Sequence, residues 1–431
     1  MGKIEELINR LAHTKVQTVP LWSVTAWDKK FNAVDKAMQK KIVRYKYLLA
    51  KDLEKLVVPN GTIRILYTTK DVAYTTEKLA SGYISEGEVV AIPWGGNPTV
   101  KYYNGKFVTG DNRIVTALDK TTLDNKYLFY WMDCETKTLA SFYRGAGIKH
   151  PSMVSVLTME IPLPPLAVQK EIVEILDTFT RMIDNLQKEL EQRQKQFEYY
   201  QEKILNFDDV IQQEGEVFIK KKGILGEIDE LIKQFCPDGV RETLLGEIMT
   251  IVRGASPRPI KNYMSDKING IPWIKIGDVN PNDKYIRNTA EYVTKEGAKK
   301  SRFLHKGDFI LSNSMSFGRP YILGIDGCIH DGWIAMSGFE KDVCSKYLYY
   351  ILRCDTTQKY WRMHANNGGA MTNLNADIVR GTPIPLPPLA VQAKIVEFLD
   401  TFTGMIDNLQ QEIELRQKQY EYYREKLLTF E

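Results

Sequence analysis

The stretch IPLPPLAVQKEIVEILDTFTRMIDNLQKELEQRQKQFEYYQEKILNF, residues 161–207, decides the organisation of this chain because it occurs twice. Shifted by 223 residues, it lies without a gap on IPLPPLAVQAKIVEFLDTFTGMIDNLQQEIELRQKQYEYYREKLLTF, residues 384–430, and 36 of 47 positions are identical. A weaker echo precedes each copy, since IEELINRL (4–11) resembles IDELIKQF (228–235). The period is far longer than that of a solenoid. The chain therefore has two halves, each with a variable body followed by a repeated tail.

Apolar residues recur in both tails with the seven-residue spacing of a coiled coil. One seam contains Leu176, Ile183, Leu190 and Phe197 in the first tail and Leu399, Ile406, Ile413 and Tyr420 in the second. Five consecutive heptads with both seam positions filled predict a long helix that pairs with another helix. The prolines keep the approaching chain extended and allow a helix to begin near Leu166. We interpret the proline cluster as a structural element without chemistry of its own.

The second seam contains a charged residue at one equivalent position of each tail, Arg193 and Arg416. A charged group is costly in a dry seam, so these arginines either specify register or meet an acidic partner. The alternative is that each guanidinium extends to solvent along the helix surface. The spacing alone allows the two helices to pair either parallel or antiparallel.

These features predict an α+β protein with domain boundaries at the prolines. Body 1 covers residues 1–160, a first helical spacer 161–207, a linker 208–227, body 2 residues 228–383, and a second helical spacer 384–431. Each half is long enough to bury its own core.

The composition is that of an ordinary globular protein, with 43% hydrophobic and 26% charged residues among 431. No run of 18 apolar residues occurs and the first residues do not form a signal peptide, so we expect a cytoplasmic protein. The five cysteines are scattered and form no CxxC pair, which argues against disulfides and a zinc site.

Positive charge is concentrated in the two bodies, although the net charge is only +4. Residues 250–320 hold 13 Lys and Arg against 6 Asp and Glu, and residues 40–150 hold 17 against 11. Residues 170–207 hold 6 against 8, so the first tail is close to neutral. Two separate basic blocks suggest a polyanionic partner that is contacted at two places.

Sequence motifs for catalysis are missing. The chain has no GxxxxGK[ST] phosphate loop, no Asp/Asn-Pro-Pro-aromatic motif of amino-methyltransferases, and no metal-like spacing of its five histidines. We therefore predict no catalytic residues and no metal site in this chain, which favours a binding protein.

The bodies contain strand-like runs that lead into loops rich in Gly, Asn and Ser, where GEVVAIPWGGNP (87–98) takes the place of GDFILSNSMSFGR (307–319). Arg suits guanine edges, Asn suits adenine edges, and Lys and Ser suit phosphates. Ordinary solvated loops are the alternative, and Trp94 and His150 fit either a core or a partner surface. The candidate DNA-binding residues are Lys70, Asn97, Lys101, Arg144 and Lys149 in body 1, and Arg253, Arg258, Lys261, Ser312, Asn313, Ser314, Arg319, Asn366 and Asn367 in body 2.

Two variable bodies, each followed by PLPPLAVQxxIVxxLD and a long helix, resemble the specificity subunit of Type I restriction–modification systems. The motif stands here as IPLPPLAVQKEIVEILD (161–177) and IPLPPLAVQAKIVEFLD (384–400). GIPWIKIGDV (270–279) and LSNSMSFGRP (311–320) are also similar to segments of that family's target recognition domains. Body 1 departs from the pattern, because its residues 22–52 are diverged and read as more helical.

The resemblance implies two mixed α/β target recognition domains, each reading one half of a bipartite asymmetric site in double-stranded DNA. It also implies that the two long helices form an antiparallel coiled coil with a pseudo-twofold repeat, which spaces the domains. Two modification subunits would bind the assembly and supply adenine methylation with S-adenosylmethionine. Restriction subunits would add ATP- and Mg-dependent translocation and cleavage. This chain itself would bind no cofactor and catalyse no reaction.

A coiled-coil adaptor that links two protein partners, without sequence-specific DNA binding, fits the repeated helices equally well. A neighbouring gene for a methyltransferase would favour the DNA-reading subunit over this alternative.

Overall fold

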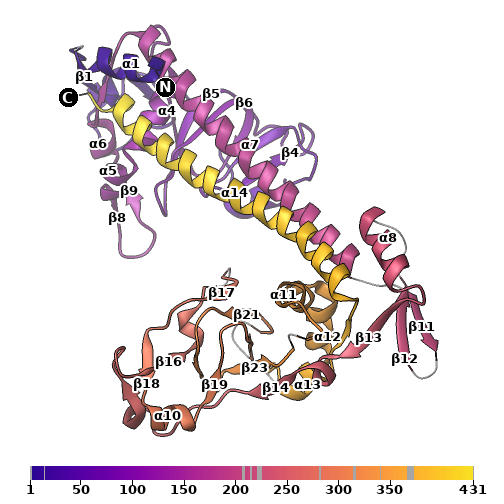
Figure 1. Cartoon of the computed structure of the whole chain (residues 1–431). Coiled ribbons are helices and arrows are strands. Elements are labelled where there is room, and N and C mark those ends of the chain that lie inside the picture. The colour runs from indigo at the N-terminus through magenta and orange to yellow at the C-terminus, as the bar shows by residue number, and fades with distance from the viewer. Residues whose placement is uncertain are drawn as a thin grey trace. The chain divides into compact units, whose positions relative to one another are not determined.

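The computed structural model divides into two compact units, and each mixes helices and sheets (Figure 1). Unit 1 comprises Met1–Lys188 and Gln411–Glu431, and unit 2 comprises Glu189–Gln410. Each unit thus contains one body together with part of both repeated tails. The structure describes residues 2–13, 15–205, 209–213, 216–220, 226–280, 283–313, 317–339, 341–365 and 373–430.

Unit 1 is built on a six-stranded sheet with the order β2-β7-β5-β6-β3-β4. These strands are β2 (Thr25–Trp27), β3 (Ile63–Leu66), β4 (Val72–Thr75), β5 (Ser85–Pro93), β6 (Lys101–Thr109) and β7 (Asn112–Ala117). All neighbours are antiparallel except the parallel pair β3 and β6. The second half of β5 reads VVAIP and is fully buried, because the strand has neighbours on both sides, α4 packs on one face, and Tyr45 packs in the cluster on the other face.

Short elements surround this sheet. They are α1 (Gly2–Ala12), β1 (Thr18–Pro20), α2 (Leu21–Val24), η1 (Lys36–Met38), α3 (Ala50–Glu54), α4 (Asn125–Cys134), α5 (Thr136–Ser141), β8 (Tyr143–Arg144), β9 (His150–Pro151), α6 (Met153–Leu157) and β10 (Glu160–Pro162). Residues 22–52 hold only short helical pieces, so the expectation of a more helical start of body 1 is wrong. Most of the segment instead wraps the sheet as irregular chain and short bridges.

Unit 2 contains a five-stranded sheet with the order β14-β23-β20-β21-β17 and a second one with the order β15-β18-β16-β22-β19. The strands are β14 (Thr250–Arg253), β15 (Met264–Ser265), β16 (Ile271–Ile274), β17 (Tyr285–Ile286), β18 (Glu291–Val293), β19 (Arg302–Leu304), β20 (Phe309–Ser312), β21 (Pro320–Leu323), β22 (Gly327–Ile329) and β23 (Trp333–Ser337). The helices are α8 (Gly226–Phe235), α9 (Leu245–Ile248), η2 (Ile260–Tyr263), η3 (Ile276–Asp278), α10 (Lys295–Lys299), α11 (Ser345–Arg353), α12 (Asp355–Ala365) and α13 (Ala376–Arg380).

The segment predicted as a linker, 208–227, carries strands β11 (Asp209–Gln213) and β12 (Glu216–Lys220). They extend a sheet with the order β11-β12-β13-β24, in which β13 is Val240–Leu244 and β24 is Pro383–Pro385.

The first sheets of the two bodies share one topology. Both run from an edge strand through three antiparallel neighbours to a strand paired in parallel, β3 in unit 1 and β17 in unit 2. The register of the paired strands also agrees. Val90 lies opposite Val115 in unit 1, and the residues 220 positions later in the chain, Ile310 and Ala335, lie opposite each other in unit 2. The bodies therefore use one scaffold although their sequences share little.

The repeated tails form helices α7 (Leu166–Leu205) and α14 (Leu389–Leu428), each of 40 residues (Figure 1). In unit 1 the rings of Phe179 and Tyr423 lie 5.6 Å apart, and in unit 2 those of Tyr200 and Phe402 lie 5.4 Å apart. The early part of one helix thus meets the late part of the other in each unit, which confirms antiparallel packing. The predicted seam is also confirmed, because the side chains at both seam positions are less exposed than those between them.

Each seam arginine binds within its own helix. Arg193 lies 3.6 Å from Glu189, and Arg416 donates to Glu412 at 2.7 Å, in both cases four residues earlier. About a third of each arginine side chain is exposed, so neither side chain is shielded from solvent. The acidic partner therefore comes from the same helix, at the edge of the seam.

The glutamine of each proline motif joins a body to its helix. Gln169 is fully buried; its amide nitrogen donates to the carbonyls of Thr122 and Pro164, and its amide oxygen accepts from the Asp124 N–H at 2.9 Å. Gln392 repeats this pattern with the carbonyls of Asp342 and Pro387 and the N–H of Cys344. We call this three-bond contact the glutamine bridge. Every atom it binds is a backbone atom, so it tolerates different side chains in the two bodies.

A second contact is also repeated in both units. Tyr130 donates to Asp177 at 2.6 Å, and Lys126 pairs with the same carboxylate at 2.7 Å. In unit 2 the equivalent contacts join Tyr350 and Lys346 to Asp400. Lys126 and Lys346 each begin a KYL triplet in the sequence, and these two segments attach helices α4 and α11 to the long helices.

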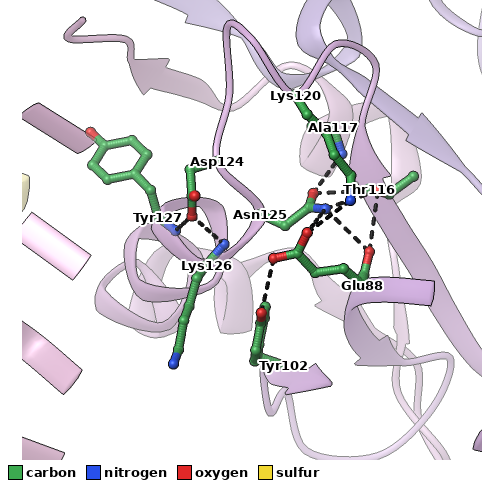
Figure 2. A network of polar contacts seen from close by, with 9 residues as sticks. All are labelled: Glu88, Tyr102, Thr116, Ala117, Lys120, Asp124, Asn125, Lys126 and Tyr127. Carbon is green, nitrogen blue, oxygen red and sulfur yellow. Dashed lines mark hydrogen bonds and ion pairs between the residues drawn. The ribbon is translucent and has the colours of Figure 1, made fainter. Parts of the chain in front are cut away.

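Figure 2 shows how α4 is attached to the sheet of unit 1. Asp124 caps the helix by accepting from the backbone N–H groups of Lys126 and Tyr127. Asn125 accepts from the Ala117 N–H at 2.7 Å and donates to the backbone oxygen of Glu88. The Glu88 carboxylate in turn accepts from Tyr102 and Lys120, both at 2.9 Å. The glutamine bridge therefore continues into a polar network that reaches strands β5, β6 and β7.

Replacing Gln169 by Leu should lower the free energy of unfolding by about 2–5 kcal/mol, because three backbone groups lose their partner in a buried site. Denaturant unfolding of the full chain measures the loss, and hydrogen exchange should show faster exchange of the Asp124 N–H, which loses its acceptor. Gln187→Leu, an exposed change in the same helix, is the control and should cost less than about 0.5 kcal/mol. Equal losses in the two variants would contradict the role given to the bridge.

Candidate nucleic-acid interface

Three of the predicted residues of body 1 lie on two loops that contact each other. Asn97 lies in the loop after β5, and Arg144 and Lys149 lie on the β8–β9 hairpin; all three are exposed. The Gly96 N–H donates to the Lys149 carbonyl at 3.0 Å, and a ring nitrogen of His150 lies 2.7 Å from the Trp94 carbonyl. The two loops therefore present one continuous polar surface.

A buried ion pair supports these loops from below. The guanidinium of Arg113 stacks on Trp94 at 4.2 Å and donates to Asp111 at 2.8 Å. Asp28 lies 3.7 Å from Arg113, and both side chains are almost fully buried. Burial raises the pKa of Asp28 to about 6, although Arg113 acts in the opposite direction. Trp94 is thus held between the core and the loops.

Lys101 and Lys70 belong to a different place in unit 1. The ammonium of Lys101 donates to the carbonyls of Tyr67 and Thr69 and to the side chain of Asn112. Burial, helped by the nearby Arg64, lowers the pKa of Lys101 to about 8. Lys101 therefore supports the loop that carries the exposed Lys70, and its own ammonium has internal acceptors.

In unit 2 a cleft of about 340 Å³ brings together polar residues from four separate segments. Arg253 and Asn313, both predicted from the sequence, lie in its wall. The cleft is also lined by His330, Asp331, Gly332, Ile334, Asn373, Leu374, Asn375 and Ala376. Donors and acceptors of this kind suit the edges of bases.

Asp331 is the centre of this arrangement. Its backbone oxygen accepts from Arg253 Nε at 3.1 Å and from the Asn313 side-chain amide at 3.3 Å. Its carboxylate accepts from Ser256 at 2.8 Å and from Arg258 at 3.2 Å. Burial raises the pKa of Asp331, but the hydrogen bond from Ser256 and the neighbouring charges outweigh it and lower the pKa below its usual value.

The remaining predictions of body 2 do not line the cleft, or they lie outside the described residues. Arg258 and Lys261 are exposed. Ser312 is fully buried, and its hydroxyl accepts from the Arg319 N–H at 3.4 Å. Gly318 has a φ of +66° and no room for a side chain against Trp361. Ser314, Asn366 and Asn367 lie outside the described residues. None of these positions is tested for DNA contact, so all stay predictions.

Sequence reasoning missed His330, Asp331, Asn373 and Asn375. One signal could have pointed to Asp331, because Asp111 stands 220 residues earlier, directly before strand β7, as Asp331 stands before the loop into β23. Within the part of the chain that the structure describes, no three acidic, His or Cys side chains gather as metal ligands, and no helix has the length and apolar character to cross a membrane.

Comparison with known proteins agrees with the sequence resemblance. The profile of the Type I restriction modification DNA specificity domain matches residues 34–194 and 237–416. The chain is similar to a putative type I restriction enzyme specificity subunit of Haemophilus influenzae, with 29% identity over 83% of this chain and 87% of that protein. It is also 29% identical to the EcoR124I/EcoR124II specificity subunit of Escherichia coli over 74% of each chain.

Solved structures support the fold. The crystal structure of the type I S subunit from M. genitalium matches with a TM-score of 0.59 over 97% of both chains, at 15% identity. A structure from work on assembly and conformational transition of the type I R-M system matches with a TM-score of 0.57 over 96% of this chain and 99% of that one, at 14% identity. The expected two-domain α+β fold with paired long helices is confirmed.

The pKa of Asp28 gives a testable pH dependence. Because the folded state raises this pKa from 3.8 to about 6, the folded protein takes up a proton before the unfolded chain does. Stability should therefore rise as the pH falls from 7.5 to 5.5, by about 1 kcal/mol for this one group. Asp28→Asn should remove that increment in denaturant unfolding, whereas Ser141→Ala, an exposed change without an ionisable group, should keep it. An unchanged pH dependence in Asp28→Asn would contradict the assignment.

Proposed function

Since this chain belongs to the family of the Type I restriction modification DNA specificity domain, we propose that it is the non-catalytic, sequence-recognising subunit of a Type I restriction–modification complex. Each body is a target recognition domain that reads one half of a bipartite, asymmetric site in double-stranded DNA. The paired helices set the distance between the half-sites and bind the modification subunits.

The observation that carries this proposal is one scaffold used twice with different loops. The sheets share topology and register, and the glutamine bridge is the same in both units. The loops above the sheets differ, with Trp94 over a buried arginine in body 1 and the Asp331 cleft in body 2. Recognition of two different half-sites requires the same scaffold in both bodies together with different contact surfaces.

The repeated helices also offer equivalent surfaces for two partner subunits. In unit 1 a groove of about 360 Å³ is lined by Ile4, Phe179, Met182 and Tyr423 among others. In unit 2 the equivalent Phe402 lies beside Tyr200, and Met405, the equivalent of Met182, is exposed as Met182 is. We assign these apolar surfaces to the two modification subunits, one on each unit, since the same surface residues occur once in each repeated helix.

The chemistry belongs to the partners in this proposal. The modification subunits use S-adenosylmethionine to methylate adenine, and restriction subunits, where present, use ATP and Mg. The complex acts on cellular DNA, so we place it in the cytoplasm. This chain contributes the choice of sequence.

The test is methylation of a random duplex library by this chain assembled with two modification subunits. We expect one bipartite motif, and binding that weakens steeply with salt because Lys and Arg contact phosphates. Exchanging body 2 for that of another family member should change one half-site only. Equal methylation of all sequences would contradict the proposal and favour the adaptor.

The spacing role makes a separate prediction. Duplicating one heptad in both helices, residues 183–189 and 406–412, keeps the seam and lengthens the pair by about 10 Å. The gap between the half-sites should grow by about three base pairs of B-DNA, with both half-sites unchanged. Seven residues inserted into the 208–227 segment are the control and should leave the gap as it was. An unchanged gap after the helix duplication would show that the helices do not set the spacing.

A further inference from the structure

We propose that body 2 reads a guanine through Arg253, and that Asp331 is the positioning residue that holds Arg253 for this contact. The inference rests on the proposed function and names the chemistry of one position in one half-site. It follows from the contacts of the cleft in unit 2.

The guanidinium of Arg253 is held at one end. Its Nε donates to the Asp331 backbone oxygen at 3.1 Å, and the side chain is exposed at the wall of the cleft. Among the residues that the structure describes, neither terminal nitrogen of Arg253 has a hydrogen-bond partner. A guanidinium fixed through Nε presents two parallel N–H donors, and guanine presents two adjacent acceptors, O6 and N7, in the major groove.

The backbone that carries Arg253 is also fixed. The Gly254 N–H donates to the Trp333 carbonyl at 2.8 Å, and a side chain at Gly254 would lie 2.2 Å from the His330 carbonyl oxygen. Residue 254 therefore packs directly on the chain that contains Asp331. This close approach fixes the backbone from which the exposed Arg253 side chain reaches the wall of the cleft.

The Asp331 carboxylate holds the next part of the same segment. It accepts from Ser256 at 2.8 Å and from Arg258 at 3.2 Å, and Ser256 accepts from the Asp331 N–H in return. His330 accepts from the Gly332 N–H through Nδ1, so its Nε2 faces the carboxylate at 3.0 Å. Donors surround the carboxylate, which lets an acidic residue lie on a surface that approaches phosphates.

Body 1 has an aspartate equivalent to Asp331, namely Asp111, but the arginine that it binds is not available for contact with a base. Asp111 accepts from Arg113 at 2.8 Å, yet Arg113 is buried and its other terminal nitrogen donates to the Asn112 carbonyl. Its guanidinium is used inside the protein, under Trp94. We therefore assign the guanine contact to body 2 alone, which makes the two half-sites chemically different.

The experiment uses the full chain with its two modification subunits and records the methylated motif from a random duplex library. Arg253→Lys keeps the charge but loses the paired donors, so the preference for guanine at one position should fall about tenfold to a hundredfold. The other positions and the other half-site should stay unchanged. A uniform loss of affinity with the motif intact would mean that Arg253 binds phosphate, and would overturn the guanine contact.

Asp331→Asn and Ser256→Ala test the positioning role. Asp331→Asn keeps the backbone oxygen that binds Arg253 and weakens the carboxylate's contacts with Ser256 and Arg258, which fix the segment that follows Arg253. Both variants should therefore relax the same position as Arg253→Lys, by a smaller factor. Asp331→Asn combined with Arg253→Lys should add little, because both changes act on the same base contact. Asp111→Asn, the matched change in body 1, should leave the guanine preference intact. If Asp331→Asn lowers methylation of all sequences equally and keeps the motif, the residue is structural and the positioning role fails.

The outcomes separate this inference from the function it rests on. A wild-type motif without guanine in either half-site would overturn the Arg253 contact and leave sequence recognition standing. Methylation without any sequence preference would overturn the proposed function itself.

Discussion

The side-chain amide of one buried glutamine in each half is the interaction on which the rest of this structure depends. Gln169 and Gln392 each join the last extended residues of the proline motif to the chain that enters α4 or α11. A buried amide that satisfies three backbone groups is costly to remove and has one geometry. Each body is thereby attached to its helix at a fixed place, and the tyrosine and lysine contacts to Asp177 and Asp400 strengthen the same joint.

Because the glutamine bridge binds only backbone atoms, it sets no requirement on the side chains of the residues that it joins. The two bodies keep the same strand order while their loops diverge, and the equivalent aspartates show how far this goes. Asp111 accepts from a buried arginine under Trp94, whereas Asp331 holds an exposed arginine at the rim of a cleft. One scaffold position thus borders the core in one body and lines an open cleft in the other.

The candidate site could be predicted only in part, and the reasons are physical. Arg253 and Asn313 were found because Arg and Asn in glycine-rich loops suit base edges, and the cleft brings both together. Lys101 was predicted because lysine suits phosphates, but strand β6 places its ammonium against the Tyr67 and Thr69 carbonyls. Asp331 belongs to no motif, since its partner Ser256 lies 75 residues away in the chain and only folding brings the two together.

The sequence by itself determined the repeat, the length and seam of the two helices, the start of each helix after the prolines and the likeness to a known family. These are local or periodic properties, which a single stretch of chain displays in its spacing. Heptad spacing left the direction of the helix pair open, and the tertiary structure confirmed the antiparallel packing that the family resemblance implied. The tertiary structure alone decided the shared strand register of dissimilar bodies and which polar side chains meet in one cleft. Both features depend on contacts between segments far apart in the chain. Many of these contacts are made by backbone atoms, which are the same in every residue and so cannot be recognised in the sequence.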